Sequence, residues 1–222
     1  MPGYILHLTA GKILSNKTSK ELSENNFLLG NLLPDVERNK IISHFQDPRN
    51  NSKILRYPDL DRFIKKYRNL LEESSVYGYY YHLYIDRKFY KEYLPKLITY
   101  FDAYGNITDE RENVEWVYIK RTGEKIPFVQ FYSDQYYYGD FTKLNNYLIE
   151  NYALPMDLKP DSINPVITEI NYSDINKVIR ELNSYLFMPI SAINDLNFFE
   201  INDLLSFLQL AANEWISKGD IC

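Results

Sequence analysis

The sequence contains little cysteine and little histidine, and this narrows the kinds of site that it can build. Its 222 residues include one cysteine, Cys222, and three histidines. A single cysteine excludes an internal disulfide framework and a cluster of thiolate metal ligands. Any metal site in this chain must therefore use nitrogen and oxygen donors.

The sequence also lacks a long apolar run and an excess of basic residues. Its best apolar stretch, residues 27–33, falls well short of the ~20 residues that span a bilayer. The N-terminal segment has no basic start, and His7 interrupts its apolar residues, which argues against a secretory signal. With 25 basic and 30 acidic residues the net charge is −5, which disfavours binding to duplex nucleic acid. We expect a soluble, cytoplasmic protein without a transmembrane segment.

Hydrophobic residues make up 45% of the chain and aromatic residues 16%, enough for a sizeable core. The length favours a single domain, residues 1–222. Apolar residues recur at the three- and four-residue spacing of helices, and the polar segment 35–51, which contains Pro48, is typical of an ordered loop. Helices are predicted at residues 4–14, 19–29, 58–71 (with Pro58 in the first turn), 75–93, 141–148, 174–186 and 198–216.

One region has a different pattern. Residues 114–119 alternate in the manner of a strand, residues 121–124 form a turn, and apolar residues resume at 126. The sequence therefore predicts a mainly α protein with a small β-hairpin insertion near residues 113–131.

All three histidines fall within the first 86 residues, each near an acidic residue. His82 and Asp86 are four residues apart in a predicted helix, so their side chains share one face with Cβ atoms ~5–6 Å apart. Such a pair can chelate one cation, although it could equally be an ordinary helix contact. A divalent metal ion needs three or more such donors, so the confinement of every histidine to this region predicts a shared metal site.

Further donors precede this pair. Asp35 follows Pro34, His44 lies in the predicted loop, and His7 lies in the first helix near the small residues Ala10 and Gly11, which permit close helix packing. Taken alone, each is more typical of a turn, a cap or a structural residue.

These residues resemble the zinc-dependent phospholipase C family, which is related in fold to fungal single-strand nucleases. The resemblance covers about residues 1–95 and implies an all-α bundle that hydrolyses phosphodiesters or phosphocholine-type headgroups. Its matching pieces, in the order of the family, are His7, the Leu-Pro-Asp turn ending at Asp35, His44, and the Gly-aromatic-His-x-x-x-Asp segment of residues 78–86.

The resemblance further implies that Asp35, His44, His82 and Asp86 bind one metal ion. His7 would help to bind a second ion that shares Asp86 as a bridge. These donors suffice for one or two divalent ions, zinc first, with manganese or iron as alternatives. The family places further histidines on later helices for a third zinc ion, and this chain has none after His82.

The function predicted from these residues is metal-dependent hydrolysis of phosphoester bonds, as in a phospholipase C-like phosphodiesterase. Asp35 is the candidate catalytic residue, as a ligand and as a base that orients the attacking water. The substrate would be a small phosphate ester or a lipid headgroup. One alternative is a non-catalytic helical protein that is stabilised by metal at a degenerate site. Another, an HD-type phosphohydrolase, needs an adjacent His-Asp dipeptide that this sequence lacks.

Two aromatic-rich segments leave further alternatives open. The tyrosines around His82 could line a ligand pocket, but packing in the core is favoured. A second cluster, residues 131–140, could contribute Asp134 or Asp140 to the site, or Asp140 could cap the next helix. Arg87 could add positive charge for a phosphate, although it points about 100° away from Asp86 on the helix.

Overall fold

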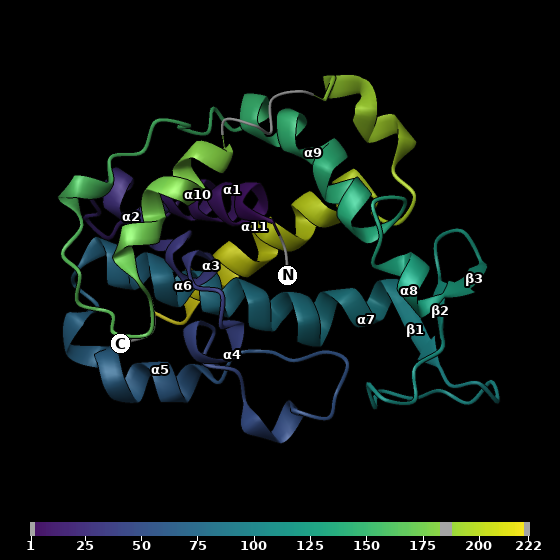
Figure 1. Cartoon of the computed structure of the whole chain (residues 1–222). Coiled ribbons are helices and arrows are strands. Elements are labelled where there is room, and N and C mark those ends of the chain that lie inside the picture. Colours follow the sequence, from purple (N-terminus) through teal and green to yellow (C-terminus); the bar gives the residue numbers. More distant parts are fainter. Residues whose placement is uncertain (1–2, 183–187, 220–222) are drawn as a thin grey trace.

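Helices form most of the structure, as the spacing of apolar residues predicts. The computed structural model describes residues 3–182 and 188–219. Three short strands form the rest of its regular structure. The elements are α1 (Tyr4–Ser15), α2 (Glu24–Gly30), α3 (Leu33–Val36), α4 (Lys40–Ser43), α5 (Leu60–Tyr67), α6 (Ser74–Lys88), α7 (Leu94–Leu97), β1 (Ile98–Phe101), β2 (Trp116–Ile119), β3 (Glu124–Pro127), α8 (Phe128–Phe131), α9 (Tyr137–Asn151), α10 (Ile175–Leu182) and α11 (Ile201–Ser217) (Figure 1).

Helix α6 runs through the centre of the helical part (Figure 1) and packs against α1, α2, α3, α5 and α11. Its tyrosines are core residues, as favoured from the sequence. Tyr79 and Tyr80 lie parallel to the ring of Phe63, with centroids 5.4 and 5.3 Å away. The indole of Trp215 in α11 donates a 2.6 Å hydrogen bond to the hydroxyl of Tyr77. Aromatic packing therefore fixes α6 on several sides.

Two glycines allow α2 and α6 to come into backbone contact. A Cβ atom on Gly78 would lie 2.1 Å from the carbonyl oxygen of Phe27, and one on Gly30 would lie 2.2 Å from that of Ser75. No larger residue fits at either position without moving a backbone. This close approach sets how α6 lies beside the end of α2, where Asn31 follows.

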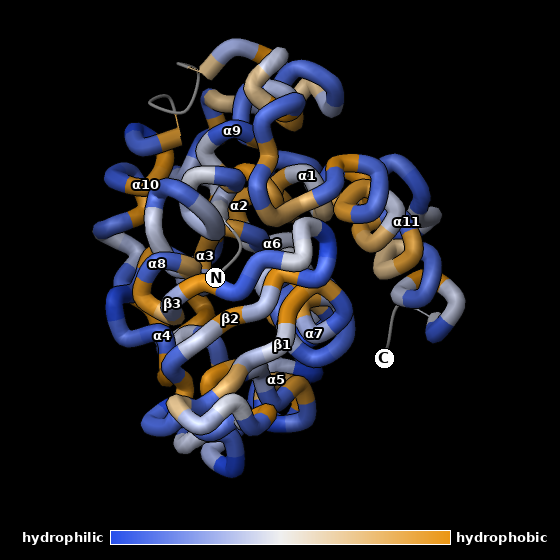
Figure 2. Tube along the Cα trace, turned by 90° about the vertical axis from the view of Figure 1, so that its right-hand side faces the viewer, coloured by the Kyte–Doolittle hydropathy of each residue, from blue (hydrophilic) through white to orange (hydrophobic). Residues whose placement is uncertain are grey.

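The predicted hairpin is confirmed, but a third strand pairs with it and a helix follows it directly. Strands β2 and β3 pair antiparallel, with Val117 opposite Ile126. Strand β1, which the sequence analysis missed, adds to β2 with Ile98 opposite Ile119, and Figure 2 shows the three strands side by side. Residues 128–131 form α8 and do not extend the hairpin. The sheet lies beyond α7, away from the α1–α2 end of the bundle (Figure 1).

Pro34 and Pro95 each lie in the first turn of a short helix. Pro34 lies in the first turn of α3, so the predicted loop begins with a helix, and it contains α4 as well. Pro95 lies in the first turn of α7, which continues α6 through a π-helical segment, Phe89–Tyr93. Proline suits the first turn of a helix because its missing N–H has no partner there.

Other boundaries also move. Helix α2 begins at Glu24, later than the predicted residue 19, and α9 begins earlier than predicted. Helix α5 begins at Leu60 and not at Pro58, because the side chain of Asp59 caps it by accepting from the N–H of Arg62. Helix α10 confirms the first part of the prediction for residues 174–186, and residues 183–186 lie outside the described residues. Within the described ranges, no helix is long and apolar enough to cross a membrane.

Candidate metal centre

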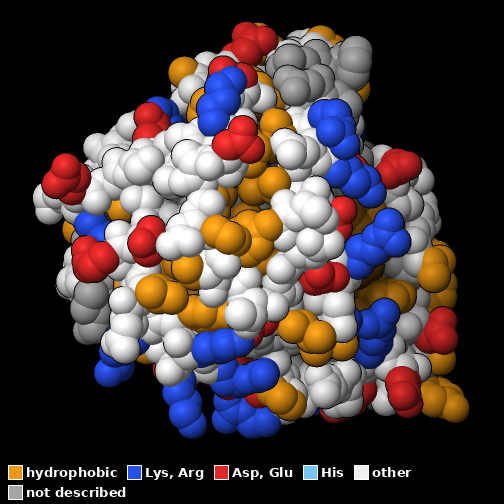
Figure 3. All heavy atoms as spheres, turned by 60° about the vertical axis from the view of Figure 1, so that its left-hand side comes forward, with side chains coloured by type: hydrophobic (Ala, Val, Ile, Leu, Met, Phe, Trp, Pro, Cys, Tyr) orange, Lys and Arg blue, Asp and Glu red, His pale blue; other side chains and the backbone are white. Residues whose placement is uncertain are grey.

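The five predicted metal ligands come from four places in the chain and meet inside the protein. His7 lies on α1, Asp35 on α3, His44 directly after α4, and His82 and Asp86 on α6. The histidines and Asp86 are at most 1% exposed, and Asp35 is 8% exposed. The face drawn in Figure 3 accordingly displays no histidine side chain. The structure thus brings together every candidate ligand.

Asp86 lies between the imidazoles. Its Oδ1 atom is 3.4 Å from Nε2 of His7, and its Oδ2 atom is 3.5 Å from Nε2 of His44 and 3.7 Å from Nε2 of His82. Nε2 of His44 is also 3.4 Å from Oδ1 of Asp35. The two oxygens of Asp86 therefore face different imidazoles, an arrangement that suits a carboxylate shared between two ions.

The orientation of His82 is fixed by a backbone carbonyl. Its Nδ1 atom lies 2.7 Å from the carbonyl oxygen of Asn31. A carbonyl can only accept, so Nδ1 carries the hydrogen and the neutral ring presents a lone pair at Nε2. Metal-binding histidines are commonly held in this way, with the distal N–H donated to a carbonyl. The close contact of α2 and α6 at Gly30 and Gly78 places Asn31 where it can do so.

Nε2 of His44 is 3.2 Å from Nε2 of His82. The Nδ1 atom of His44 is 3.0 Å from the hydroxyl of Ser43, and the hydroxyl of Tyr79 donates to the carbonyl of Ser43. Phe45, the next residue, has φ of 49°, a conformation that is unusual for a side chain of this size. Its ring packs edge-on against Phe63. The packing of Phe45 thus stabilises the sharp turn that aims His44 at His82.

Within the described part of the chain, Nδ1 of His7 has no hydrogen-bond partner, and Nε2 of His7 and Oδ1 of Asp86 have only their mutual contact at 3.4 Å. The ring of His7 stacks on that of His82, with centroids 3.6 Å apart. Buried polar atoms without partners are rare in folded proteins, and a bound ion commonly accounts for them. These weakly bonded nitrogen and oxygen atoms of His7 and Asp86 are available as donors to a metal ion.

Asp35 differs from the other four because it has a basic neighbour and a route to solvent. The ammonium of Lys40 donates to its Oδ1 at 3.0 Å and to its carbonyl oxygen at 2.7 Å. Both residues line a pocket of about 210 Å³ between α3 and α10. Asp35 is therefore the cluster residue through which a small ligand can approach.

The electrostatics of the cluster favour a bound cation. Burial, together with the neighbouring His7, lowers the pKa of His82 to about 3, although Asp86 and Asp35 oppose the shift. Burial raises the pKa of Asp86, but contact with His7 and the charges of the three imidazoles outweigh this and lower it. The same balance, with His44 and Lys40, holds the pKa of Asp35 well below its usual range. At neutral pH, Asp35 and Asp86 are thus ionised and His82 is neutral, with the ammonium of Lys40 beside Asp35.

Three residues weighed from the sequence do not join the cluster. Asp134 is exposed. Asp140 lies inside α9 and does not cap it; its buried carboxylate accepts hydrogen bonds from the backbone N–H groups of Asn197, Phe198 and Phe199. Arg87 donates to the carbonyl of Pro58.

Conversely, Asn31 and Lys40 contact the cluster although no sequence pattern pointed to them. Asn31 acts through its backbone, which leaves no side-chain signal. Lys40 is one of many lysines, and only the fold of α3 and α4 brings it to Asp35.

Two sets of donor atoms lie within 4.8 Å of one another and could hold a metal ion: His7, Asp35 and His82, and His44, His82 and Asp86. The first set groups Asp35 with His7, whereas the family resemblance implies that Asp35 shares an ion with His44, His82 and Asp86. Searches against protein-family models, curated proteins and solved structures found no match. The buried His/Asp cluster therefore stands on its own geometry as a candidate metal centre.

Proposed function

We propose that this chain is a metal-dependent phosphoester hydrolase, similar to phospholipase C-like phosphodiesterases, with one or two divalent ions, zinc first. One observation carries the proposal. The Asn31 carbonyl presets His82 to present a lone pair at Nε2, which converges with His44 and with the carboxylate of Asp86. The resemblance of residues 1–95 to the zinc-dependent phospholipase C family supports the same function.

The donor set fits zinc, because neutral imidazoles and carboxylates are its usual ligands when thiolates are absent. His44, His82 and Asp86 would hold one ion, and His7 would hold a second with Asp86 and Asp35. Bound zinc supplies a water of lowered pKa and polarises a phosphoryl oxygen.

Asp35 is the residue of this chain that would handle the proton. Its pKa is held low by His44 and Lys40, so at neutral pH it is ionised and can accept a hydrogen bond from a water in the adjoining pocket. Lys40 fixes the carboxylate from one side and adds a positive charge beside the place where a phosphate would enter. Asp35 therefore orients the nucleophile, while Lys40 offsets part of the negative charge of a pocket that Glu37, Asp174 and Glu181 also line.

The proposal is tested with nitrophenyl phosphate mono- and diesters and added zinc or manganese. Hydrolysis should fall at least ~10²-fold in His82→Ala and in Asp35→Asn, since each change removes a donor that holds the metal or its water. Asp134→Asn, an exposed aspartate outside the cluster, is the matched control and should keep full activity. Activity that survives both cluster changes would place the chemistry elsewhere.

A second candidate is supported by the burial of the cluster. His7, His44, His82 and Asp86 do not line the 210 Å³ pocket that reaches Asp35. A metal ion held by these four alone would act as a staple between α1, α4 and α6, as in closed structural sites. This candidate predicts a protein that binds zinc and is stabilised by it, but hydrolyses no phosphate ester.

A further inference from the structure

A second polar site lies beside Tyr90, just beyond the end of α6, in a pocket of about 440 Å³. Two arginines, Arg56 and Arg111, line it together with Gln46, and none of its lining residues in the described part of the chain is acidic. The rest of the lining is apolar or aromatic: Ile54, Leu55, Tyr90, Phe128, Val129, Tyr132 and Tyr138.

The two arginines have no counter-charge among the described residues. Neither guanidinium has an ion pair or a side-chain hydrogen bond in residues 3–182 and 188–219. Arg56 is half-buried, and burial together with the charge of Arg111 lowers its pKa. Arg111 is exposed at the mouth of the pocket. Two guanidinium groups at one pocket repel each other, and an anion bound between them would remove this cost.

Gln46 points to a ligand independently. It is 8% exposed, its Oε1 atom has no hydrogen-bond partner, and its amide nitrogen donates to no other group in the described part of the chain. A buried amide of this kind normally has partners. Its N–H₂ group can donate to a phosphate oxygen.

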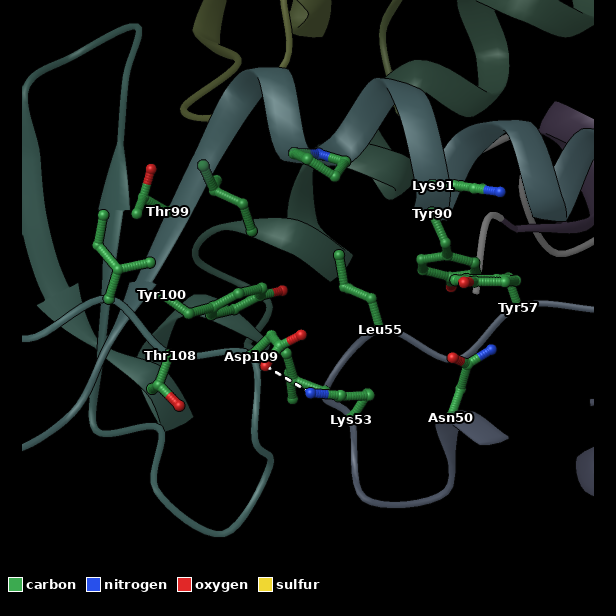
Figure 4. A pocket seen from close by; sticks show the side chains of 14 residues that line it. Asn50, Lys53, Leu55, Tyr57, Tyr90, Lys91, Thr99, Tyr100, Thr108 and Asp109 are labelled. Atoms are coloured by element: carbon green, nitrogen blue, oxygen red, sulfur yellow. Dashed lines mark hydrogen bonds and ion pairs between the residues drawn. The ribbon is translucent and has the colours of Figure 1, made fainter. Parts of the chain in front are cut away.

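The larger neighbouring pocket, about 780 Å³, is lined by two lysines and one acidic residue. Lys53 forms an ion pair of 2.8 Å with Asp109 there (Figure 4), and the ammonium of Lys91 lies over the ring of Tyr57. Tyr90, which is labelled in Figure 4 where it lines the larger pocket, also lines the arginine pocket. It follows Asp86 by four residues, and burial and the charges of Tyr137 and Asp86 raise its pKa. Through Tyr90 the arginine pocket borders the helical segment that follows Asp86.

We propose that Arg56, Arg111 and Gln46 form an anion subsite that binds the phosphate group of a phosphomonoester, with the organic part of the ligand against Phe128 and Tyr132. Guanidinium groups bind phosphate through paired N–H donors, which gives both charge and direction. The aromatic lining favours an organic phosphate over inorganic phosphate. The described lining of this pocket contains none of the five candidate metal ligands, and the subsite does not require the proposed hydrolysis.

The test is calorimetric titration of the full chain with phenyl phosphate and with inorganic phosphate, as isolated and after chelator treatment. Phenyl phosphate should bind more tightly than inorganic phosphate in both preparations. Arg56→Met and Arg111→Met should each weaken its binding at least about tenfold, because each removes a charged donor. Arg180→Met changes an exposed arginine of α10 that lines no part of this pocket, and its affinity should stay unchanged.

The Arg111→Glu variant should remain folded. The substitution replaces the repulsion between the two arginines by an attraction between Arg56 and the new carboxylate. This variant should have a thermal midpoint no lower than that of the wild type, and phenyl phosphate should no longer raise that midpoint. Equal affinity in wild type, Arg56→Met and Arg111→Met would overturn the subsite. So would binding that is lost on chelation and ignores the arginines, since this would assign the phosphate to the metal centre.

Discussion

Two buried aspartates, Asp86 and Asp140, have opposite surroundings. Asp140 accepts three backbone N–H groups at 2.6–3.0 Å, and Lys143 lies 3.5 Å from it. Asp86 faces only imidazole nitrogens, at 3.4–3.7 Å, among the described residues. The first carboxylate is satisfied by the fold and serves to hold residues 197–199 against α9. The second is surrounded by groups that are themselves metal donors. Burial alone therefore does not identify a metal ligand, whereas the kind of neighbour does.

The imidazoles reach Asp86 because α6 lies in backbone contact with α2. Breaking that contact should have the largest effect on stability and on metal binding. Gly78→Ala places a methyl group 2.1 Å from the carbonyl oxygen of Phe27. The helices must separate, which should cost about 3 kcal/mol or more of unfolding free energy and move His82 from the Asn31 carbonyl. Urea unfolding and zinc titration measure the two effects.

Gly3→Ala is the matched control, because nothing lies within 4 Å of a Cβ atom there. If Gly78→Ala were as stable as this control and bound zinc as well as the wild type, the helix contact would not position His82.

The next effect separates the two aspartates directly. Asp140→Asn replaces an anion that accepts three backbone N–H groups by an amide with one acceptor, so it should lower the unfolding free energy by about 2 kcal/mol, with or without metal.

Asp86→Asn should behave differently in chelator-treated protein. It removes a buried charge that only imidazoles compensate, and the lowered pKa of Asp86 means that this charge contributes some stability. The metal-free unfolding free energy should therefore fall, but by less than in Asp140→Asn. Zinc should then stabilise this variant much less than the wild type. A loss of stability equal to that of Asp140→Asn would mean that the two carboxylates play the same structural part.

A smaller effect concerns pH. In the folded, metal-free protein the pKa of His82 is about 3, below the ordinary value of 6.5. Between these values the unfolded chain binds the additional proton, so stability from this group is complete above pH 6.5 and is lost as the pH falls. The slope is about 1.4 kcal/mol per pH unit. The lowered pKa values of Asp35 and Asp86 add a loss of the same sign below pH 3.8.

Urea unfolding between pH 7 and pH 4 in chelator measures this slope. His82→Gln cannot take up the proton and should reduce the slope by about one proton. An unchanged slope in this variant would show that His82 is not held neutral.

The parts of the site that the sequence predicted are those that follow from local geometry. His82 and Asp86 share a face because they are four residues apart on one helix, and the alternation of residues 114–119 was sufficient for the hairpin. The contacts of Lys40 with Asp35 and of Asn31 with His82 depend on tertiary packing and have no local pattern. Pro34 is ambiguous in the sequence because proline fits both the end of an apolar stretch and the first turn of a helix.

Strand β1 and the arginine pocket also depend on contacts between distant segments, so the sequence did not predict them. Strand β1 has four residues and forms only by pairing with β2. Arg56 and Arg111 are 55 positions apart and meet because the segments around them pair, with the N–H of Ile54 donating to the carbonyl of Asp109. No spacing rule links such residues in advance.

The most direct test of the metal centre is metal content combined with anomalous scattering at the zinc edge, in wild type, Asp86→Asn and His7→Ala. The account predicts one or two ions per chain, located among His7, Asp35, His44, His82 and Asp86. Asp86→Asn should lower occupancy at both positions, and His7→Ala should chiefly empty one. A wild-type protein that takes up no zinc, manganese or iron, or whose ions ignore Asp86→Asn, would contradict it.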